Sequence, residues 1–153
     1  MKVYQSPDIH DPFSPLYELS RALDGVEYVG SVSQPELARA FQSADILAYL
    51  NTFPELACIA VMEAMASDCL VITSSLGALP ETTGGHGFLM DVSKDQMETV
   101  ANYAKLTIDT INQAYDDPDG FSERLAQQKA FANQMYSWET RAEEWVEWLQ
   151  TLL

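Results

Sequence analysis

The sequence has few positively charged residues. It contains 8 Lys and Arg against 23 Asp and Glu, which gives a formal net charge of −15 at pH 7. A field of this sign repels the phosphates of nucleic acids and anionic lipid headgroups. The composition therefore argues against nucleic acid and acidic membrane surfaces as partners.

Cysteines and long apolar runs are also scarce. Only Cys58 and Cys69 are present, and both stand in apolar stretches, whereas a chain stapled by disulfides carries more cysteines among polar loops. Residues 1–15 lack the cationic start and apolar segment of a signal peptide, and no apolar run approaches the roughly 20 residues of a membrane helix. We therefore expect reduced thiols, a cytoplasmic location and no membrane contact.

Several catalytic signatures are missing. The sequence has no P-loop, no glycine-rich dinucleotide fingerprint and no nucleophile elbow, and neither cysteine has the neighbouring Cys or His that a zinc site needs. We expect no metal and no resident cofactor.

Short strand-like runs alternate with helix-like segments. Residues 26–29, 46–50, 70–73 and 88–90 are rich in Val, Ile, Leu, Tyr and Phe, and Val3-Tyr4 is a candidate fifth strand. Alternation of this kind predicts crossover connections, and hence an α/β fold with a Rossmann-like, doubly wound parallel sheet. The place of a first central strand holds only a stub before the proline-broken residues 6–15, so the domain is expected to lack its first strand and helix.

Helices are expected from apolar spacing and from helix-start and helix-stop residues. In the last of them, Trp145, Trp148 and Leu149 recur at spacings of three and four, which predicts an amphipathic helix laid against another surface. The predicted helices cover residues 16–23, 37–43, 57–66, 95–113, 121–133 and 138–152.

The helix at residues 57–66 is apolar on nearly every side, so we expect it to be buried on both faces. It carries one carboxylate, Glu63, and the sequence has no Lys or Arg between Arg39 and Lys94. An unpartnered buried carboxylate costs several kcal/mol. Glu63 must therefore reach a cleft, a distant cation or a pair of ligand hydroxyls, unless it is simply exposed or satisfied structurally.

Glu55 stands between the end of a predicted parallel strand and the start of that helix, where open α/β sheets bind ligands. Its alternative role is a favourable charge near a helix N-terminus, which position alone favours. The free N–H groups of Ala57, Cys58 and Ile59 could receive a diphosphate, although every helix start offers such donors.

The loop after residues 70–73 brings further polar groups to the same sheet edge. Gly77 permits a tight turn, and Pro80 and Glu81 can begin a short helix that adds a third carboxylate. His86 is either a general base or a loop histidine without a catalytic role, and the second interpretation is favoured.

The order of these motifs resembles a known family. Phe53-Pro54-Glu55, Glu63-Ala64-Met65-Ala66, the strand at residues 70–73 and Gly77-Ala78-Leu79-Pro80-Glu81 resemble the carboxyl-terminal, nucleotide-sugar-binding domain of retaining glycosyltransferases with the GT-B fold, of the family 4 type. The resemblance covers roughly residues 26–153.

This resemblance assigns expected roles to individual residues. Glu55 would lie against the transferred sugar as the catalytic carboxylate, and Glu63 would accept hydrogen bonds from the ribose hydroxyls. The remaining roles are diphosphate binding by backbone amides and contact with the base, which fall on Ala57, Cys58, Ile59 and Ala60 and on Gly30, Ser31 and Val32, respectively.

The resemblance implies transfer of a sugar from a nucleoside diphosphate sugar to a hydroxyl acceptor with retention, without a bound metal. The sequence departs from the family at Cys58, where a glycine is common, and at Asp68 and Leu70, where Gly and Pro are usual. No residue in 1–21 matches the family's Arg and Lys that neutralise the diphosphate.

We therefore expect residues 1–153 to form a single, truncated carboxyl-terminal domain that lacks the amino-terminal Rossmann domain for the acceptor. Such a fragment would be inactive by itself and could self-associate through its carboxyl-terminal helices. The alternatives are a non-catalytic binding or interaction module on the same fold, and a nucleotide-sugar 2-epimerase-like enzyme.

Overall fold

The structure is a computed structural model that describes residues 13–152. The chain divides into two units, Met1–Gln34 and Pro35–Leu153, and each is treated by itself below. The candidate strand at Val3-Tyr4 and most of residues 6–15 lie outside the described residues.

The N-terminal unit is built on helix α1 (Ser14–Ala22), which carries a proline in its first turn as expected. The chain then turns back on the helix, where the rings of Tyr17 and Tyr28 stack with centroids 4.9 Å apart. The Arg21 guanidinium lies 4.7 Å from the centre of the Tyr28 ring. Aromatic and cation–π contacts therefore hold this short unit together.

The predicted strand at residues 26–29 is wrong. These residues are in neither helix nor strand, and Val29 keeps 64% of its surface exposed. A strand forms only where a neighbour completes its hydrogen-bond ladder. The described part of this unit contains no strand that could pair with residues 26–29, so their β-rich composition is not sufficient to form a strand.

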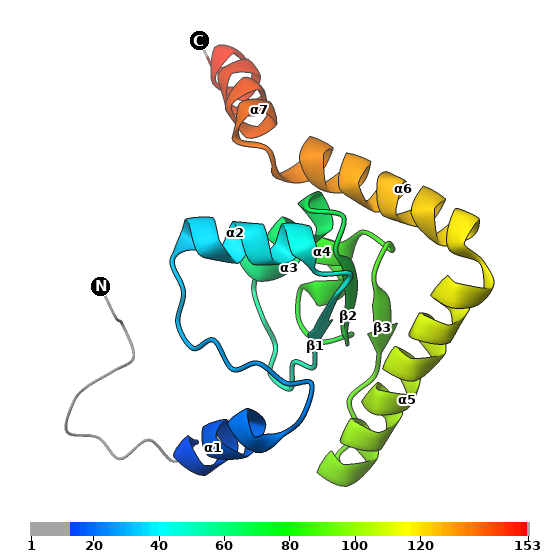
Figure 1. The fold of residues 1–153 in the computed structure, drawn as a ribbon. Coiled ribbons are helices and arrows are strands. Elements are labelled where there is room, and N and C mark those ends of the chain that lie inside the picture. Colours follow the sequence, from blue (N-terminus) through cyan, green and yellow to red (C-terminus); the bar gives the residue numbers. More distant parts are fainter. Residues whose placement is uncertain (1–12, 153) are drawn as a thin grey trace, which may run out of the picture. The chain divides into compact units, whose positions relative to one another are not determined.

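The second unit contains a parallel sheet of three strands in the order β1-β2-β3. The strands are β1 (Ile46–Tyr49), β2 (Leu70–Ser74) and β3 (Phe88–Met90). Ile46 pairs with Leu70, and Ile72 pairs with Phe88. Every residue of the central strand β2 is buried, as expected of a strand in an α/β sheet. The predicted fold class is confirmed (Figure 1).

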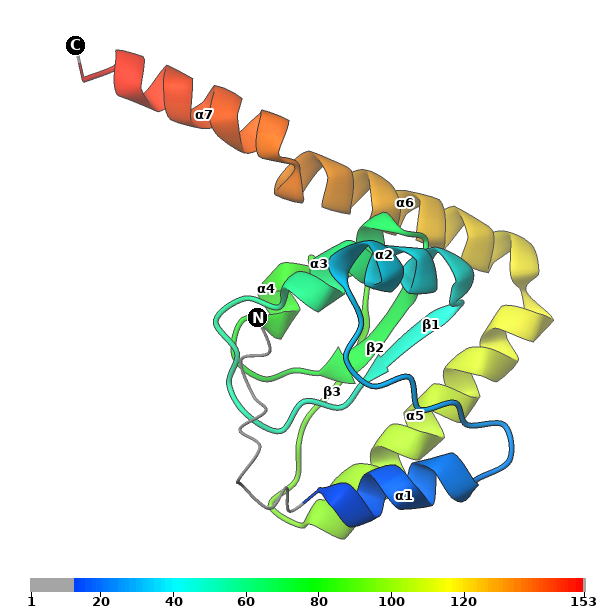
Figure 2. The same cartoon turned by 60° about the vertical axis from the view of Figure 1, so that its left-hand side comes forward.

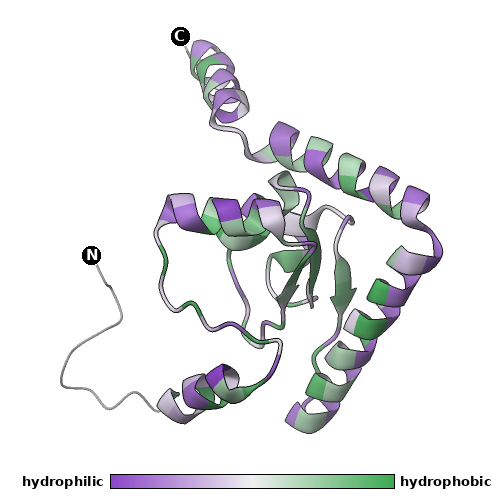
Figure 3. Ribbon diagram, in the orientation of Figure 1, coloured by the Kyte–Doolittle hydropathy of each residue, from purple (hydrophilic) through white to green (hydrophobic). Residues whose placement is uncertain are grey.

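Helices cover both faces of the sheet. Val71 belongs to a buried cluster with Val61 of α3 (Ile59–Ala66) and Leu79 of α4 (Leu79–Thr83), the two crossover helices. Leu70, which the strand's two-residue period turns the other way, lines a cavity of about 550 Å³ with residues of α5 (Gln96–Asp116). Figures 1 and 2 show α5 on the side of the sheet away from α3, and Figure 3 shows the hydrophobic residues concentrated in the strands and α3.

The remaining helices are α2 (Gln34–Ser43), α6 (Pro118–Tyr136) and α7 (Trp138–Gln150). The predicted breaks between α5, α6 and α7 are shorter than expected. Asp117 caps α6 by accepting a hydrogen bond from the Gly120 N–H, and Ser137 caps α7 in the same way for Thr140. Each break therefore shrinks to one capping residue.

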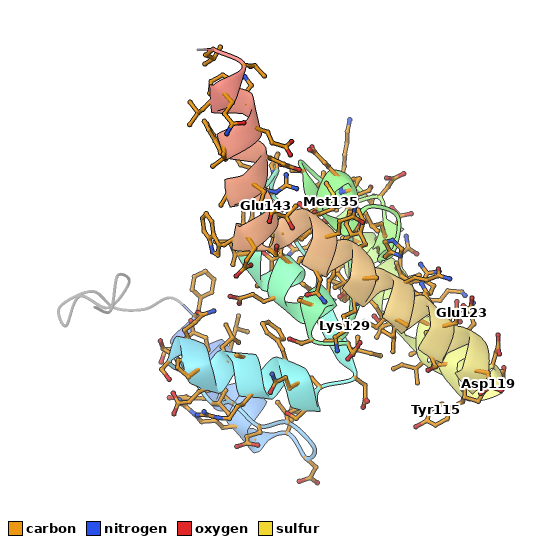
Figure 4. All side chains as sticks on the ribbon, turned by 90° about the horizontal axis from the view of Figure 1, so that it is seen from above. Tyr115, Asp119, Glu123, Lys129, Met135 and Glu143 are labelled. Carbon is orange, nitrogen blue, oxygen red and sulfur yellow. The ribbon has the colours of Figure 1, made fainter. Side chains whose placement is uncertain are left out.

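Helix α6 is tied to the sheet and to α3. The buried Gln128 side chain donates to the Cys69 carbonyl at 2.9 Å, and Lys129 forms an exposed ion pair with Asp68. Figure 4 shows Lys129 near the middle of α6, with Asp119 and Glu123 in its first turns. Asp68 has φ +60°, a conformation that favours glycine, at the turn into β2.

Helix α7 has no buried residue, and Trp145 keeps 61% of its surface exposed. The Trp145 ring packs edge to face against the Trp148 ring, with centroids 5.4 Å apart. Among the described residues, nothing buries this aromatic stripe as the amphipathic pattern predicts.

Candidate active site

Glu55 lies in the loop that joins the carboxyl end of β1 to α3. Its side chain is half-buried, and its carboxylate accepts a hydrogen bond from the hydroxyl of Tyr49, the last residue of β1. Burial, this hydrogen bond and the charges of Glu55 and Cys58 raise the pKa of Tyr49 well above its ordinary value. The tyrosine is therefore a neutral donor throughout the physiological range.

The loop after β2 holds the backbone of Glu55. The Ala78 N–H donates to the Glu55 carbonyl at 2.8 Å. Gly77 has φ +58°, and a Cβ there would stand 2.4 Å from the same carbonyl oxygen and 2.5 Å from the Glu55 nitrogen. The turn expected at Gly77 is confirmed, and it brings the two loops into direct backbone contact.

Helix α3 begins at Ile59, two residues later than the sequence suggests. Cys58 is extended, with φ −106° and ψ 98°, and occupies the N-cap position, while Ala57 is an exposed loop residue. The Cys58 side chain is buried beside Glu55. Burial raises the pKa of the Cys58 thiol; the nearby backbone N–H of Val61 opposes this, and the Glu55 carboxylate adds to it.

Glu63 is half-buried rather than buried, and α3 is not buried on both faces as predicted. Ile59, the first residue of α3, keeps 67% of its surface exposed, whereas Val61, Ala64 and Met65 face the core. The helix is therefore one-sided despite its apolar composition. Glu63 is its fifth residue, so at about 1.5 Å per residue it lies roughly 6 Å along the axis from Ile59.

Two residues of this loop were not singled out from the sequence. Tyr49 looks like an ordinary strand residue, and only its place at the strand's carboxyl end hints at a polar role. Asn51 is 2% exposed and accepts a hydrogen bond from the Phe53 N–H at 2.8 Å, so it shapes the start of the loop. Among the described residues, its side-chain nitrogen has no hydrogen-bond partner.

One known protein family matches this chain. The family described as "Glycosyl transferases group 1" matches residues 10–109, well over half of the chain. This chain belongs to the group 1 glycosyltransferases. No curated protein and no solved structure matches it. The matched residues include Glu55, Glu63 and the Gly77 turn, and they support a carboxyl-terminal domain of the GT-B type.

The two further polar residues considered from the sequence, Glu81 and His86, lie in different surroundings. Glu81 is exposed in the first turn of α4, and its charge adds to the burial that raises the pKa of Tyr136 at the end of α6. The His86 ring packs against Phe131 at 5.1 Å, and its carbonyl accepts two hydrogen bonds from Arg124. These contacts pack the loop that contains His86 against α6.

The three residues predicted near the base, Gly30, Ser31 and Val32, belong to the N-terminal unit and are all exposed. Gly30 has φ +69°. Their predicted role stays a prediction, as do those of Ala57, Ile59 and Ala60.

Across residues 13–152, no three His, Cys, Asp or Glu side chains gather in a way that could hold a metal ion. Within the same residues, no helix is both long and apolar enough to span a bilayer. The 550 Å³ cavity lies at Asp45, Ile46 and Leu70, the opposite ends of the strands from Glu55, and is lined mainly by apolar side chains.

Proposed function

We propose that this chain is the donor-binding part of a retaining glycosyltransferase, which transfers a sugar from a nucleoside diphosphate sugar to a hydroxyl acceptor. The observation that carries the proposal is the position of Glu55. It stands at the carboxyl edge of a parallel sheet, directly before a helix, with its side chain and its backbone both held. This is the edge at which open α/β sheets bind nucleotides.

The donor would extend along the start of α3. The first helical hydrogen bond runs from the Met62 N–H to the Cys58 carbonyl at 3.1 Å, so the amides of Ile59 and Ala60 have no acceptor within the helix. We propose that they receive the diphosphate, together with Ala57 and Cys58. Glu55 would orient the sugar or stabilise positive charge at its anomeric carbon, and Glu63 would accept hydrogen bonds from the ribose.

The site has little positive charge of its own. With no Lys or Arg between Arg39 and Lys94, the loops around Glu55 offer no positively charged side chain to the diphosphate. Binding no tighter than about millimolar, worth only about 4 kcal/mol, is therefore expected of this chain alone. Such sites close between two domains, so we propose that the acceptor site comes from an amino-terminal Rossmann domain and that this chain alone transfers no sugar.

We further propose that the protein acts in the cytoplasm. This proposal is supported by Cys58 and Cys69, which are both buried free thiols.

Ligand-observed NMR on the 153-residue chain tests the donor site. UDP-glucose, UDP-N-acetylglucosamine and GDP-mannose are compared with free UDP and GDP. Glu63→Gln should weaken both the sugar nucleotides and the free nucleotides about tenfold, because both carry the ribose. A hydrogen bond to a charged group contributes about 1.5–3 kcal/mol. Glu55→Gln should weaken only the sugar nucleotides.

Glu123→Gln is the matched control, because Glu123 lies on α6 and its carboxylate accepts a hydrogen bond from the Gln127 side chain, four residues later on the same helix, at 3.3 Å. It should leave all affinities unchanged. Unchanged binding in Glu55→Gln and Glu63→Gln would reject the proposed donor site. Donor binding without transfer once the amino-terminal domain is supplied would favour a non-catalytic module, and an epimerised nucleotide sugar would favour the epimerase alternative.

A further inference from the structure

We infer that Tyr49 is a positioning residue for Glu55, which sets the direction of the carboxylate that faces the donor sugar. This inference rests on the proposed function and deepens it. Three sets of contacts carry the inference. The first holds Tyr49, the second joins Tyr49 to the Glu55 carboxylate, and the third holds the Glu55 backbone.

The first contact fixes the tyrosine itself. Tyr49 is the last residue of β1 and pairs in register with Thr73 of the central strand. Its ring packs against the buried cluster that contains Cys58, Val61 and Met65. Because the ring is held by the sheet and the core, its hydroxyl is a fixed point at the edge of the loop.

The second contact joins this fixed point to the carboxylate. The Tyr49 hydroxyl donates to Oε1 of Glu55, six residues later. The bond commits Oε1 of Glu55 and leaves Oε2 to other partners. A carboxylate with one oxygen held in this way is suited to accept hydrogen bonds from sugar hydroxyls through the other oxygen.

The third contact fixes the other end of the residue. The Glu55 carbonyl accepts from the Ala78 N–H, and Gly77 lies against the same peptide. With its backbone held by one loop and its carboxylate held by one strand, Glu55 has little freedom before a donor arrives. Such preorganisation lowers the cost of binding and of charge stabilisation.

The test is a double-mutant cycle on the 153-residue chain, using Tyr49→Phe, Glu55→Gln and the double variant. The measured quantity is the ratio of affinities for UDP-glucose and free UDP, with GDP-mannose and GDP as a second pair. We expect Tyr49→Phe to lower this ratio threefold to tenfold and to leave the affinity for free UDP or GDP unchanged. In the Glu55→Gln background, Tyr49→Phe should have no further effect.

Tyr103→Phe is the matched control. Its hydroxyl donates to the backbone carbonyl of Ile72 at 2.7 Å, so the substitution removes a comparable hydrogen bond without touching a carboxylate. It should leave the affinity ratio unchanged. A loss in Tyr103→Phe equal to that in Tyr49→Phe would show that the effect is only structural and would overturn the inference.

The remaining outcomes separate the inference from the proposed function. An effect of Glu55→Gln without an effect of Tyr49→Phe overturns the positioning role and leaves the function standing. Additive effects show that Tyr49 contacts the donor directly and also overturn the role. If neither variant changes the ratio, or the wild type shows no sugar-dependent binding, both proposals fail.

A second measurement keeps the inference testable should Tyr49→Phe fold poorly. The wild type and Glu55→Gln are compared by the NMR chemical shifts of the tyrosine ring carbons at neutral pH. Because the Tyr49 hydroxyl donates to the Glu55 carboxylate, the ring carbons of one tyrosine should shift in the variant. Identical tyrosine spectra would show that the two side chains do not interact in solution and would overturn the inference.

Discussion

Replacement of Gly77 by alanine tests the contact between the two loops that hold Glu55. Gly77 has φ +58°, and an added Cβ would lie 2.4 Å from the Glu55 carbonyl oxygen and 2.9 Å from the Pro54 carbonyl carbon. All of the nearest atoms belong to the backbone, so no side-chain rotation relieves the clash. The loop after β1 must move.

The expected loss has two parts. An L side chain in the left-handed region costs roughly 1–2 kcal/mol relative to glycine, and a forced backbone shift costs roughly 1–3 kcal/mol. Gly77→Ala should therefore lower the free energy of unfolding by about 3 kcal/mol. For a chain of this size, each kcal/mol changes Tm by roughly 2–4 °C, so Tm should fall by about 6–12 °C.

Gly85→Ala is the matched variant for thermal unfolding followed by circular dichroism. Gly85 has φ +83°, but no atom lies within 4 Å of an added Cβ, so only the conformational part of the cost applies. Its Tm should fall by about 2–8 °C, less than in Gly77→Ala. Equal losses in the two variants would refute the argument, because they would mean that the Gly77 loop does not press on Glu55 in solution.

Three further predictions follow from the packing and the charges. Asp68 has φ +60° and an exposed ion pair with Lys129 worth at most about 1 kcal/mol, so Asp68→Gly should be more stable than Asp68→Ala by about 1 kcal/mol in thermal unfolding; the reverse order would contradict a left-handed turn there. Burial, with a contribution from the Asp45 charge, raises the pKa of Cys69 to about 11, so the unfolded thiol loses its proton first. Stability should therefore fall as the pH rises from about 9 to 11, and the Tm profile of Cys69→Ala should be flatter over this range, whereas parallel profiles would contradict the assignment. Because the α7 stripe is exposed, the chain should self-associate at high concentration in sedimentation velocity, and Trp145→Glu should abolish this; a monomer at all concentrations would refute the expectation.

The sheet could be predicted from the sequence because its three strands combine β-rich composition with helical crossovers of the right length. Residues 46–49, 70–74 and 88–90 find partners in one another, and the prediction holds within one residue at each end. Residues 26–29 have the same composition, but strand formation depends on a pairing neighbour that composition does not supply. Three of the four β-rich segments have a neighbouring strand to pair with and form strands, whereas residues 26–29 have none in the described part of their unit.

The candidate site was accessible to sequence reasoning only in part. Gly77 is marked by its position after a parallel strand. For Glu55, position alone favoured a charge near a helix N-terminus, and only the order of the surrounding motifs, which resembles a glycosyltransferase domain, gave it a role at the ligand-binding edge. The burial of α3 was overestimated because apolar composition does not say which sides have neighbours, and Ile59 is exposed in spite of it. Tyr49 could not be recognised from the sequence, because its ring fits the pattern of a strand residue and its contact with the site is a hydrogen bond from its hydroxyl to the Glu55 carboxylate.

The contacts that hold Glu55 all come from the unit in which it lies. Everything that fixes Glu55, including the Tyr49 hydroxyl, the Ala78 amide and the close approach of Gly77, belongs to the unit Pro35–Leu153. The loops around Glu55 contain no Lys or Arg, and the chain as a whole carries −15. Orientation of the Glu55 carboxylate is thus built into one unit. Under the proposed function, these loops supply an oriented carboxylate and backbone N–H groups but no cation, so they contribute more to the position of an anionic donor than to its affinity.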